Sequence, residues 1–395
     1  MLTIPIQLLL LLAGGLSDRP VEVRTLDGAL SAQLKEIDRD GCLILGDDRK
    51  IHAGDWYAIR RRPLPPAPRG PFVELTNGDR IAGVVADADG DALHLRMTIQ
   101  DSQPQMLRVP MSALRVAWLT HRMGDDLEPE WLSSPRKRDV LRARNGDVLL
   151  GSIANIDSTK NLVRLQVDGK DQQLELSKLA AIAFNTDLAR FRRPKGPYYR
   201  LTLANGTRLS VNSLTFDGQT WVAVTPFKDT VRIDVEQVVA ADVEQGKVVY
   251  LSDLKPVSYQ YRPYDGEQFS LAPDRAVTGR PMILRTSAGE STFDRGLGIH
   301  AECTISYSLG GKYRRFETLA GMDAGSGVRG EAEIALLLDG KEQPLPNNGK
   351  LTFTGGPVPI QVNLNAAKEL TIVVRRRAGG NVQAHVDLAE ARLVP

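Results

Sequence analysis

The stretch Phe293-Asp-Arg-Gly-Leu-Gly-Ile-His-Ala-Glu-Cys-Thr-Ile-Ser-Tyr-Ser-Leu309 decides how this sequence folds. It places a Gly-x-Gly turn and a histidine directly before a run in which apolar and polar residues alternate. Alternation with a period of two is typical of a β-strand that buries one face. Further short alternating runs follow at regular intervals, at residues 304–309, 316–322, 332–338, 350–353, 360–364, 370–375 and 384–394. They predict a β-sandwich or jelly roll over residues 247–395.

A repeated turn signal divides the N-terminal part of the chain. Asp27-Gly28, Asn77-Gly78, Asn145-Gly146 and Asn205-Gly206 each stand between alternating apolar runs, which is a strong hairpin signal. Each unit then closes with apolar residues at positions i, i+2, i+5 and i+8, which predicts a strand, a tight helical turn and a return strand. Trp56 occupies the i+5 position of the first unit, so we expect it in the core.

Four small β-units follow from this pattern, at residues 18–62, 71–120, 138–190 and 197–245, with proline-rich breaks between them. A unit of this size with about five short strands is most easily a bent sheet that closes on itself, as in SH3-like or Sm-like barrels. The fold class is therefore all-β, an array of small barrel units followed by a jelly roll. The sequence leaves open whether neighbouring units share a sheet.

The N-terminus is predicted to be a signal peptide over residues 1–17. Its apolar core of about a dozen residues is too short to span a bilayer, and Ala13, Gly14 and Gly15 follow it. A hydrophobic first strand is the alternative. No other segment of the sequence is long and apolar enough to cross a membrane, so we expect a secreted, periplasmic or cell-surface protein.

Charge and cysteine content exclude several functional classes. The chain has 50 basic and 48 acidic residues, without the concentrated basic face that nucleic-acid binding needs. The arginine clusters at residues 60–62 and 136–138 stand beside prolines and are expected to be solvated linkers. Cys42 and Cys303 fall in different predicted domains, so we expect buried free thiols and no zinc or iron–sulfur site.

Catalytic motifs are missing from the sequence. It has no His-Glu-x-x-His and no Gly-x-Ser-x-Gly, and Gly296-Leu297-Gly298 leads into a predicted strand rather than a helix. The five histidines are scattered. Paired carboxylates of a glycosidase meet only in three dimensions and stay open at this point. We predict that the protein is not an enzyme.

Five motifs, in order along the C-terminal region, resemble the NPCBM family of carbohydrate-binding modules. They are Leu251-Ser-Asp-Leu254, the opening stretch continued to Phe316, Ala320-Gly-Met-Asp323, Leu338-Asp-Gly-Lys341 and His385-Val-Asp-Leu-Ala-Glu-Ala-Arg-Leu393. The resemblance covers residues 247–395. It implies a galactose-binding-like jelly roll that holds a galactose-type or other polysaccharide in loops at one end, often with a structural calcium ion.

Candidate site residues follow from what such a domain needs, an aromatic face and fixed polar groups for sugar, and several oxygen ligands for calcium. The candidate carbohydrate-binding residues are His300, Tyr264, His385 and Asp387, and the candidate calcium ligands are Asp253 and Asp323. Structural roles are the alternatives. His300 could be buried against a backbone carbonyl, His385 and Asp387 could close the sandwich, and the other two aspartates could cap turns.

One position departs from the family. Leu388 stands where the closing motif commonly has tryptophan, and all four tryptophans of the chain lie N-terminal to the predicted jelly roll. Leu388 either repacks the core or alters the sugar site. The leading hypothesis is a secreted, non-catalytic glycan-binding protein with the small units as scaffold. The alternative is a structural or adaptor protein of the cell envelope that binds protein partners through residues 20–245, without sugar binding.

Overall fold

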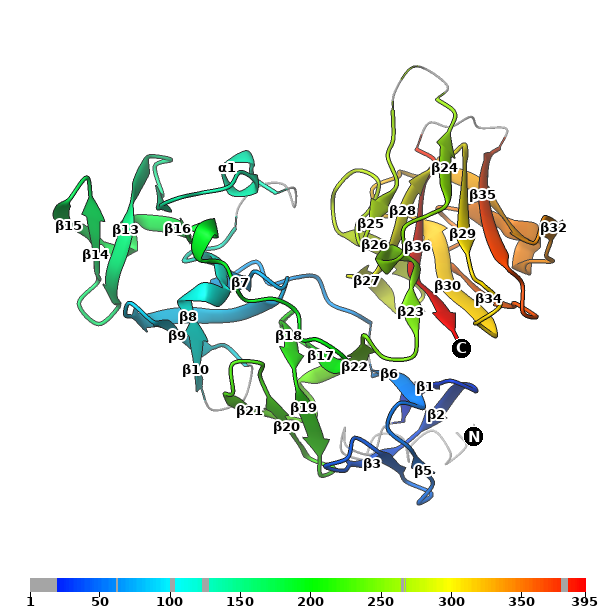
Figure 1. The fold of residues 1–395 in the computed structure, drawn as a ribbon, viewed down its shortest axis with the longest axis horizontal. Coiled ribbons are helices and arrows are strands. Elements are labelled where there is room, and N and C mark those ends of the chain that lie inside the picture. Colours follow the sequence, from blue (N-terminus) through cyan, green and yellow to red (C-terminus); the bar gives the residue numbers. More distant parts are fainter. Residues whose placement is uncertain are drawn as a thin grey trace, which may run out of the picture. The chain divides into compact units, whose positions relative to one another are not determined.

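The computed structural model describes residues 20–61, 63–99, 104–122, 128–263, 266, 268–377 and 383–395. The predicted signal peptide and Tyr264 lie outside these residues. Strands dominate the described chain, which confirms the all-β class (Figure 1). Two compact units form, and each is described by itself: an N-terminal unit of residues 1–62 and 67–244, and a C-terminal unit of residues 63–66 and 245–395. In the described ranges, no helix is long and apolar enough to cross a membrane.

The N-terminal unit repeats one strand order four times. The first repeat has β1 (Val21–Thr25), β2 (Gly28–Ala32), β3 (Leu34–Ile37), β4 (Leu43–Leu45), β5 (Lys50–Ile51) and β6 (Trp56–Arg60). The second has β7 (Phe72–Leu75), β8 (Arg80–Ala88), β9 (Ala92–Met97), β10 (Gln105–Pro110), η4 (Met111–Ala113) and β11 (Leu114–Trp118).

The third repeat follows the short helix α1 (Glu130–Ser133). It has β12 (Asp139–Ala143), β13 (Val148–Asp157), β14 (Leu162–Val167), β15 (Lys170–Glu175), η5 (Leu176–Lys178) and β16 (Leu179–Ala183), and η6 (Thr186–Leu188) comes after it. The fourth has β17 (Tyr198–Leu203), β18 (Arg208–Val211), β19 (Ser213–Phe216), β20 (Thr220–Val224), β21 (Thr230–Asp234) and β22 (Val238–Glu244).

Each repeat closes by pairing its last strand with its first. The pairs are β1 with β6, β7 with β11, β12 with β16 and β17 with β22. One backbone hydrogen bond recurs beside every turn: Leu26 N–H to Asp55 O, Thr76 N–H to Ala113 O, Arg144 N–H to Lys178 O, and Ala204 N–H to Gln237 O. The four repeats are therefore equivalent in local structure.

Neighbouring repeats share one sheet, the point that the sequence left open. The last strands of the first and fourth repeats pair at Ile59 and Ala241, and those of the second and third pair at Ala117 and Ile182. These four residues are the final positions of the closing apolar pattern. Strand β8 also pairs with β18, so the sheet passes through the repeats in the order third, second, fourth, first.

The prediction that the two basic clusters are solvated is wrong for Arg60 and Arg136, whereas Lys137 and Arg138 are exposed as expected. Arg136 is buried because its guanidinium donates to the carbonyl oxygens of Leu132 and Phe184, at 2.8 and 3.2 Å. Arg60 pairs with Asp242 at 2.5 Å. Trp56 is 1% exposed and donates to Gly41 O at 2.9 Å, which confirms its core position.

The C-terminal unit is a β-sandwich. It contains β23 (Val249–Tyr250), η7 (Leu251–Asp253), β24 (Ser258–Tyr261), β25 (Ala272–Pro273), β26 (Met282–Thr286), β27 (Gly289–Phe293), β28 (Gly296–His300), β29 (Cys303–Ser308), β30 (Arg315–Met322), β31 (Glu331–Leu338), β32 (Lys341–Glu342), η8 (Pro346–Gly349), β33 (Lys350–Thr352), β34 (Val358–Asn363), β35 (Glu369–Arg376) and β36 (His385–Val394). One sheet has the order β25-β28-β36-β30-β34, and the other has β24-β29-β35-β31-β32.

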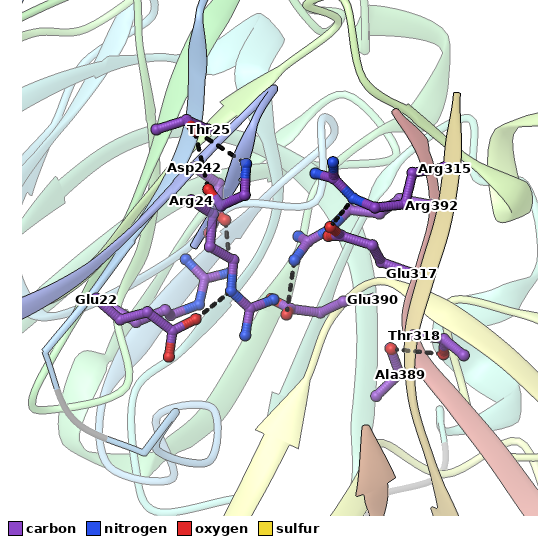
Figure 2. A network of polar contacts seen from close by, with 12 residues as sticks. Glu22, Arg24, Thr25, Asp242, Arg315, Glu317, Thr318, Ala389, Glu390 and Arg392 are labelled. Atoms are coloured by element: carbon purple, nitrogen blue, oxygen red, sulfur yellow. Dashed lines mark hydrogen bonds and ion pairs between the residues drawn. The ribbon is translucent and has the colours of Figure 1, made fainter. Parts of the chain in front are cut away.

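A shared apolar core lies between the two sheets, with Leu297, Leu388 and Ile305 among its fully buried residues. Away from that core, Arg392 is 1% exposed and contacts Glu317 at 3.3 Å and Glu390 at 3.6 Å (Figure 2).

Cys303 is buried, as predicted, and burial raises the pKa of its thiol to about 12. Cys42 in the N-terminal unit is buried as well.

The Gly-x-Gly sequence of the opening stretch lies inside a strand, so its expected turn is wrong. Gly296 and Gly298 both belong to β28, and the predicted strand at 304–309 is observed one residue earlier as β29. Glycine is needed in β28 because other backbone segments approach it closely. A Cβ at Gly298 would lie 2.3 Å from the carbonyl oxygen of Arg275.

Candidate functional site

Four of the candidate residues, His300, His385, Asp387 and Asp323, meet on the outer face of one sheet, at one end of it. On β36, Val386 and Leu388 point into the sandwich core, so His385 and Asp387 point to the opposite face. His385 lies opposite His300 in the register of β36 and β28. The two residues are therefore neighbours on the same face of the sheet.

The third strand of this face is β30, and its C-terminal end lies beside His385. Its last residue Met322 lies opposite Val386, and the next residue, Asp323, donates its N–H to His385 O at 3.0 Å. His300, His385 and Asp323 thus form a row across the strand ends. Asp387 lies one row further in.

Two aromatic side chains cover His300. The ring of Phe269 stacks on the imidazole with centroids 4.1 Å apart and an interplanar angle of 5°. Tyr261 meets His300 edge-on at 5.8 Å, and His385 lies 5.2 Å from it. We call Tyr261, Phe269, His300 and His385 the His300 cluster. It combines aromatic faces with ring nitrogens and a phenol hydroxyl.

Within the His300 cluster, burial and hydrogen bonding differ between its members. His300 is 3% exposed, whereas Tyr261, Phe269 and His385 are half-buried. Nδ1 of His300 lies 2.5 Å from the carbonyl oxygen of Ala301 and 3.3 Å from the hydroxyl of Tyr261. Since a carbonyl oxygen only accepts, Nδ1 donates its proton to Ala301 O.

Asp387 is a fully buried carboxyl group beside a second carboxyl group. It is 0% exposed and Asp323 is 4% exposed. Burial raises the pKa of Asp387 well above its usual range, and the neighbouring Asp323 carboxylate raises it further. Asp323 itself accepts the N–H groups of Ile283 and Gly325, at 3.2 and 2.9 Å. Burial and the neighbouring carboxylate therefore both favour the protonated form of Asp387.

Glycines on both neighbouring strands make room for Asp387. Gly298 and Gly321 lie opposite it in the register. A Cβ at Gly321 would lie 3.0 Å from Cδ2 of Leu284, a residue of β26. The segment around residue 275 and the β26–β27 hairpin therefore lie directly over Asp387, so its carboxyl group is enclosed by protein rather than open to a ligand.

The two candidate calcium ligands do not fit one shared site. Asp253 pairs with the guanidinium of Arg295, which also contacts Asp274 at 2.7 Å. Asp323 belongs to the row at the strand ends. Among the described residues, there is no group of three histidine, cysteine, aspartate or glutamate side chains that could hold a metal. Calcium therefore stays a prediction from the resemblance.

The structure brings together four of the predicted site residues, His300, His385, Asp387 and Asp323, and places Asp253 in a separate ion pair. Sequence reasoning missed Tyr261 and Phe269 as site residues. The only feature of the sequence that pointed to them was their aromatic character, in a segment that precedes residues 293–309. Leu388 is 0% exposed in the sandwich core, on the face opposite the His300 cluster. The leucine at this position, in place of tryptophan, therefore affects the packing of the sandwich core and not the His300 cluster.

Part of this chain is similar to known proteins. Residues 247–394 match the NPCBM/NEW2 domain family, so the resemblance is confirmed over this range. A Renibacterium salmoninarum protein described as "Putative endo-alpha-N-acetylgalactosaminidase" is 30% identical over 119 residues, which are 29% of this chain and 7% of that protein. The chain thus spans only 7% of the length of this relative.

Two solved structures are also similar. One is described as CBM51 from Clostridium perfringens GH95 in complex with methyl-galactose; it is 25% identical, with a TM-score of 0.34, over 37% of this chain and 99% of that one. The other is the tandem CBM51 modules of Sp3GH98 from Streptococcus pneumoniae; it is 12% identical, with a TM-score of 0.33, over 82% of this chain and 88% of that one.

Proposed function

We propose that the C-terminal unit binds a glycan at the His300 cluster and that the N-terminal unit serves as its scaffold. The observation that carries this proposal is the stack of Phe269 on His300, with Tyr261 and His385 beside it. The family match of residues 247–394 supports the same function. A partly accessible aromatic ring next to fixed polar atoms is the combination that sugar recognition needs, and the rings of Tyr261 and Phe269 are half-buried.

Each member of the cluster has a distinct role in this proposal. The half-buried rings of Phe269 and Tyr261 pack against the apolar C–H face of a sugar ring. Nε2 of His385 and the Tyr261 hydroxyl bond sugar hydroxyls, whereas Nδ1 of His385 is buried. His300 is too buried to do more than border the sugar, and its main role is to hold Phe269.

The two acidic residues act through other residues. Asp323 fixes the backbone of His385 by donating its N–H to the carbonyl oxygen there. Asp387 lies one row further into the sheet and interacts with the Asp323 carboxyl group. Tyr264, next to the Tyr261 strand in sequence, is retained as a proposed sugar contact outside the described residues.

A non-catalytic role is part of the proposal. Glycosidases place two carboxyl groups on either side of the scissile bond, where both must reach the substrate. The carboxyl pair beside the His300 cluster is enclosed, since Asp323 and Asp387 are 4% and 0% exposed. This pair is therefore suited to positioning rather than to acid–base catalysis.

The experiment uses the full chain on a glycan array, followed by titration calorimetry with methyl-galactoside and with the best array ligand. We expect Phe269→Ala to weaken binding about tenfold, since a lost stacking contact is worth about 0.5–1.5 kcal/mol beyond the area it buries and tenfold corresponds to about 1.4 kcal/mol. Tyr313→Ala is the matched control, because Tyr313 is also half-buried against the sandwich core but precedes β30 at the opposite end of the sheet. A folded protein that binds no glycan would falsify the proposal.

We further propose a secreted or cell-surface location. The support is the apolar run at residues 8–12 with small residues after it. N-terminal sequencing of protein recovered outside the cytoplasm tests this location directly. Cleavage near residue 17 is the expected result, and an intact N-terminus on cytoplasmic protein contradicts it.

A further inference from the structure

One strand edge of the N-terminal unit exposes apolar residues. Val148 and Leu150 of β13 are 52% and 50% exposed. Residues 148–151 of β13 pair with β12 on one side, and no described strand pairs with them on the other. A cavity of about 800 Å³, lined in part by Leu141, Leu149 and Leu174, borders this edge. Open edges with apolar side chains are templates for another strand.

The equivalent edge of the second repeat is occupied. There, β8 pairs with β18 of the fourth repeat at Arg80 and Arg208. The hairpins of the two repeats have the same register, since Val73 lies opposite Ile81 and Leu141 lies opposite Leu149. The β8–β18 contact therefore shows how a strand docks on this kind of edge.

The turns beside the two edges are also alike. In the second repeat, Asn77 Nδ2 donates to Asp79 at 3.0 Å, and Asp79 N–H donates to Asn77 Oδ1 at 3.1 Å. In the third, Asn145 Nδ2 donates to Asp147 at 2.7 Å, and Asp147 N–H donates to Asn145 Oδ1 at 3.1 Å. Asp147 is thus held in the same local geometry as Asp79.

The β8–β18 contact has a two-fold pattern. In each of the two repeats, the side chain of the residue directly after the turn glycine accepts a backbone hydrogen bond. The donor is the N–H of the residue four positions after the turn glycine of the other repeat. Asp79 accepts from Ser210 N–H at 2.8 Å, and Thr207 accepts from Ala82 N–H at 3.1 Å. In the third repeat, the same positions are Asp147 and Leu150. One edge of β13 therefore carries both the acceptor and the donor.

We propose that two copies of this chain associate through their β13 edges, antiparallel and about a two-fold axis. Asp147 of each copy accepts the Leu150 N–H of the other, and the two Val148 residues lie opposite each other at the axis, as Arg80 and Arg208 do within the chain. The contact buries the exposed Val148 and Leu150 side chains of both copies. Such an isologous contact closes as a dimer and exposes no further β13 edge.

The other end of the shared sheet favours the symmetric pairing. That end is β2 of the first repeat, the equivalent of β13. The residue after its turn glycine is Ala29, which has no acceptor in its side chain. A contact between β13 and β2 would therefore keep only one of the two side-chain bonds, whereas β13 with β13 keeps both.

Analytical ultracentrifugation of the full chain tests the proposal. We expect a dimer whose dissociation constant rises at least tenfold in Val148→Lys and in Leu150→Lys. Both side chains are already half-exposed, so these substitutions do not disturb the fold. Val84→Lys is the matched control, because Val84 is 51% exposed on β8 and lies outside the edge contact. It should dimerise like the wild type.

A cysteine at the axis gives a second readout. Under mild oxidation, Val148→Cys should form a covalent dimer, whereas Val84→Cys should not; Cys42 and Cys303 are buried and do not interfere. A monomer at all micromolar concentrations overturns the proposal. So do oligomers that persist unchanged in both lysine variants, and so does failure of the Val148→Cys protein to cross-link.

Discussion

Asp387 is a carboxyl group enclosed in the middle of a sheet, and its protonation is linked to stability. Its pKa is raised in the folded state by burial first and by Asp323 second. The proton therefore stabilises the fold fully below the unfolded pKa of about 3.9, and this contribution is lost as pH rises through the raised folded pKa. The amide side chain in Asp387→Asn cannot titrate, so we expect a weaker loss of stability between acidic and mildly alkaline pH than in the wild type.

Hydrogen exchange of the β36 amides measures this effect, because it reports on the unit that holds Asp387. Asp168→Asn is the control, since that carboxylate is 77% exposed in the N-terminal unit. It should leave the pH dependence of β36 unchanged. Equal pH dependence in the wild type and Asp387→Asn would show that Asp387 does not hold a proton in the folded state.

The residues of the site could be predicted only in part. His385 and Asp387 stand two apart in one predicted strand, so their shared sheet face follows from local periodicity, whereas His300 was expected at a turn and its pairing with His385 was not predictable. Phe269 could not be found this way, because it reaches His300 from a segment without that periodicity. Arg136 escaped prediction for a related reason, since its carbonyl partners at Leu132 and Phe184 leave no mark on local composition.

Strand β28 shows how a close approach between segments selects glycine. A Cβ at position 298 would lie 2.3 Å from Arg275 O, 2.5 Å from Val277 N and 2.6 Å from Ala276 C, all backbone atoms that cannot rotate away. We therefore expect Gly298→Ala to lower the free energy of unfolding by about 1–3 kcal/mol through overpacking. Thermal unfolding and β36 hydrogen exchange measure the loss.

Gly90→Ala is the matched control, because a Cβ there would meet nothing within 4 Å. Its stability should stay within about 0.5 kcal/mol of the wild type. An unchanged free energy of unfolding in Gly298→Ala would mean that the segment at residues 275–277 can move away without cost.

At the level of elements, the turns and closing strands were predictable, and their pairing was not. Asn-Gly turns and the period change mark β10–η4–β11 and β15–η5–β16 locally. The contact of Ile59 with Ala241 joins residues that are far apart in the sequence. Apolar residues at a strand edge indicate that the edge pairs with another strand, but they do not specify which of several equivalent strands it pairs with.

The two proposals combine at the scale of the whole molecule. A dimer through β13 would carry two glycan sites, and tethered sites can raise apparent affinity for a multivalent surface by about 10²–10⁴. We therefore expect full-chain protein to dissociate much more slowly from a glycan-coated surface than a single site allows. Leu150→Lys should lose this avidity and keep the wild-type affinity for soluble monovalent glycan, because residue 150 lies in the N-terminal unit.

Surface plasmon resonance on the glycan surface and calorimetry with the soluble ligand separate the two effects. Phe269→Ala should lose binding in both measurements and remain a dimer in the ultracentrifuge, since Phe269 belongs to the C-terminal unit. If Leu150→Lys weakens monovalent binding as strongly as surface binding, the two sites are not independent. If Leu150→Lys becomes monomeric and still dissociates from the surface as slowly as the wild type, the β13 edge contributes nothing to avidity.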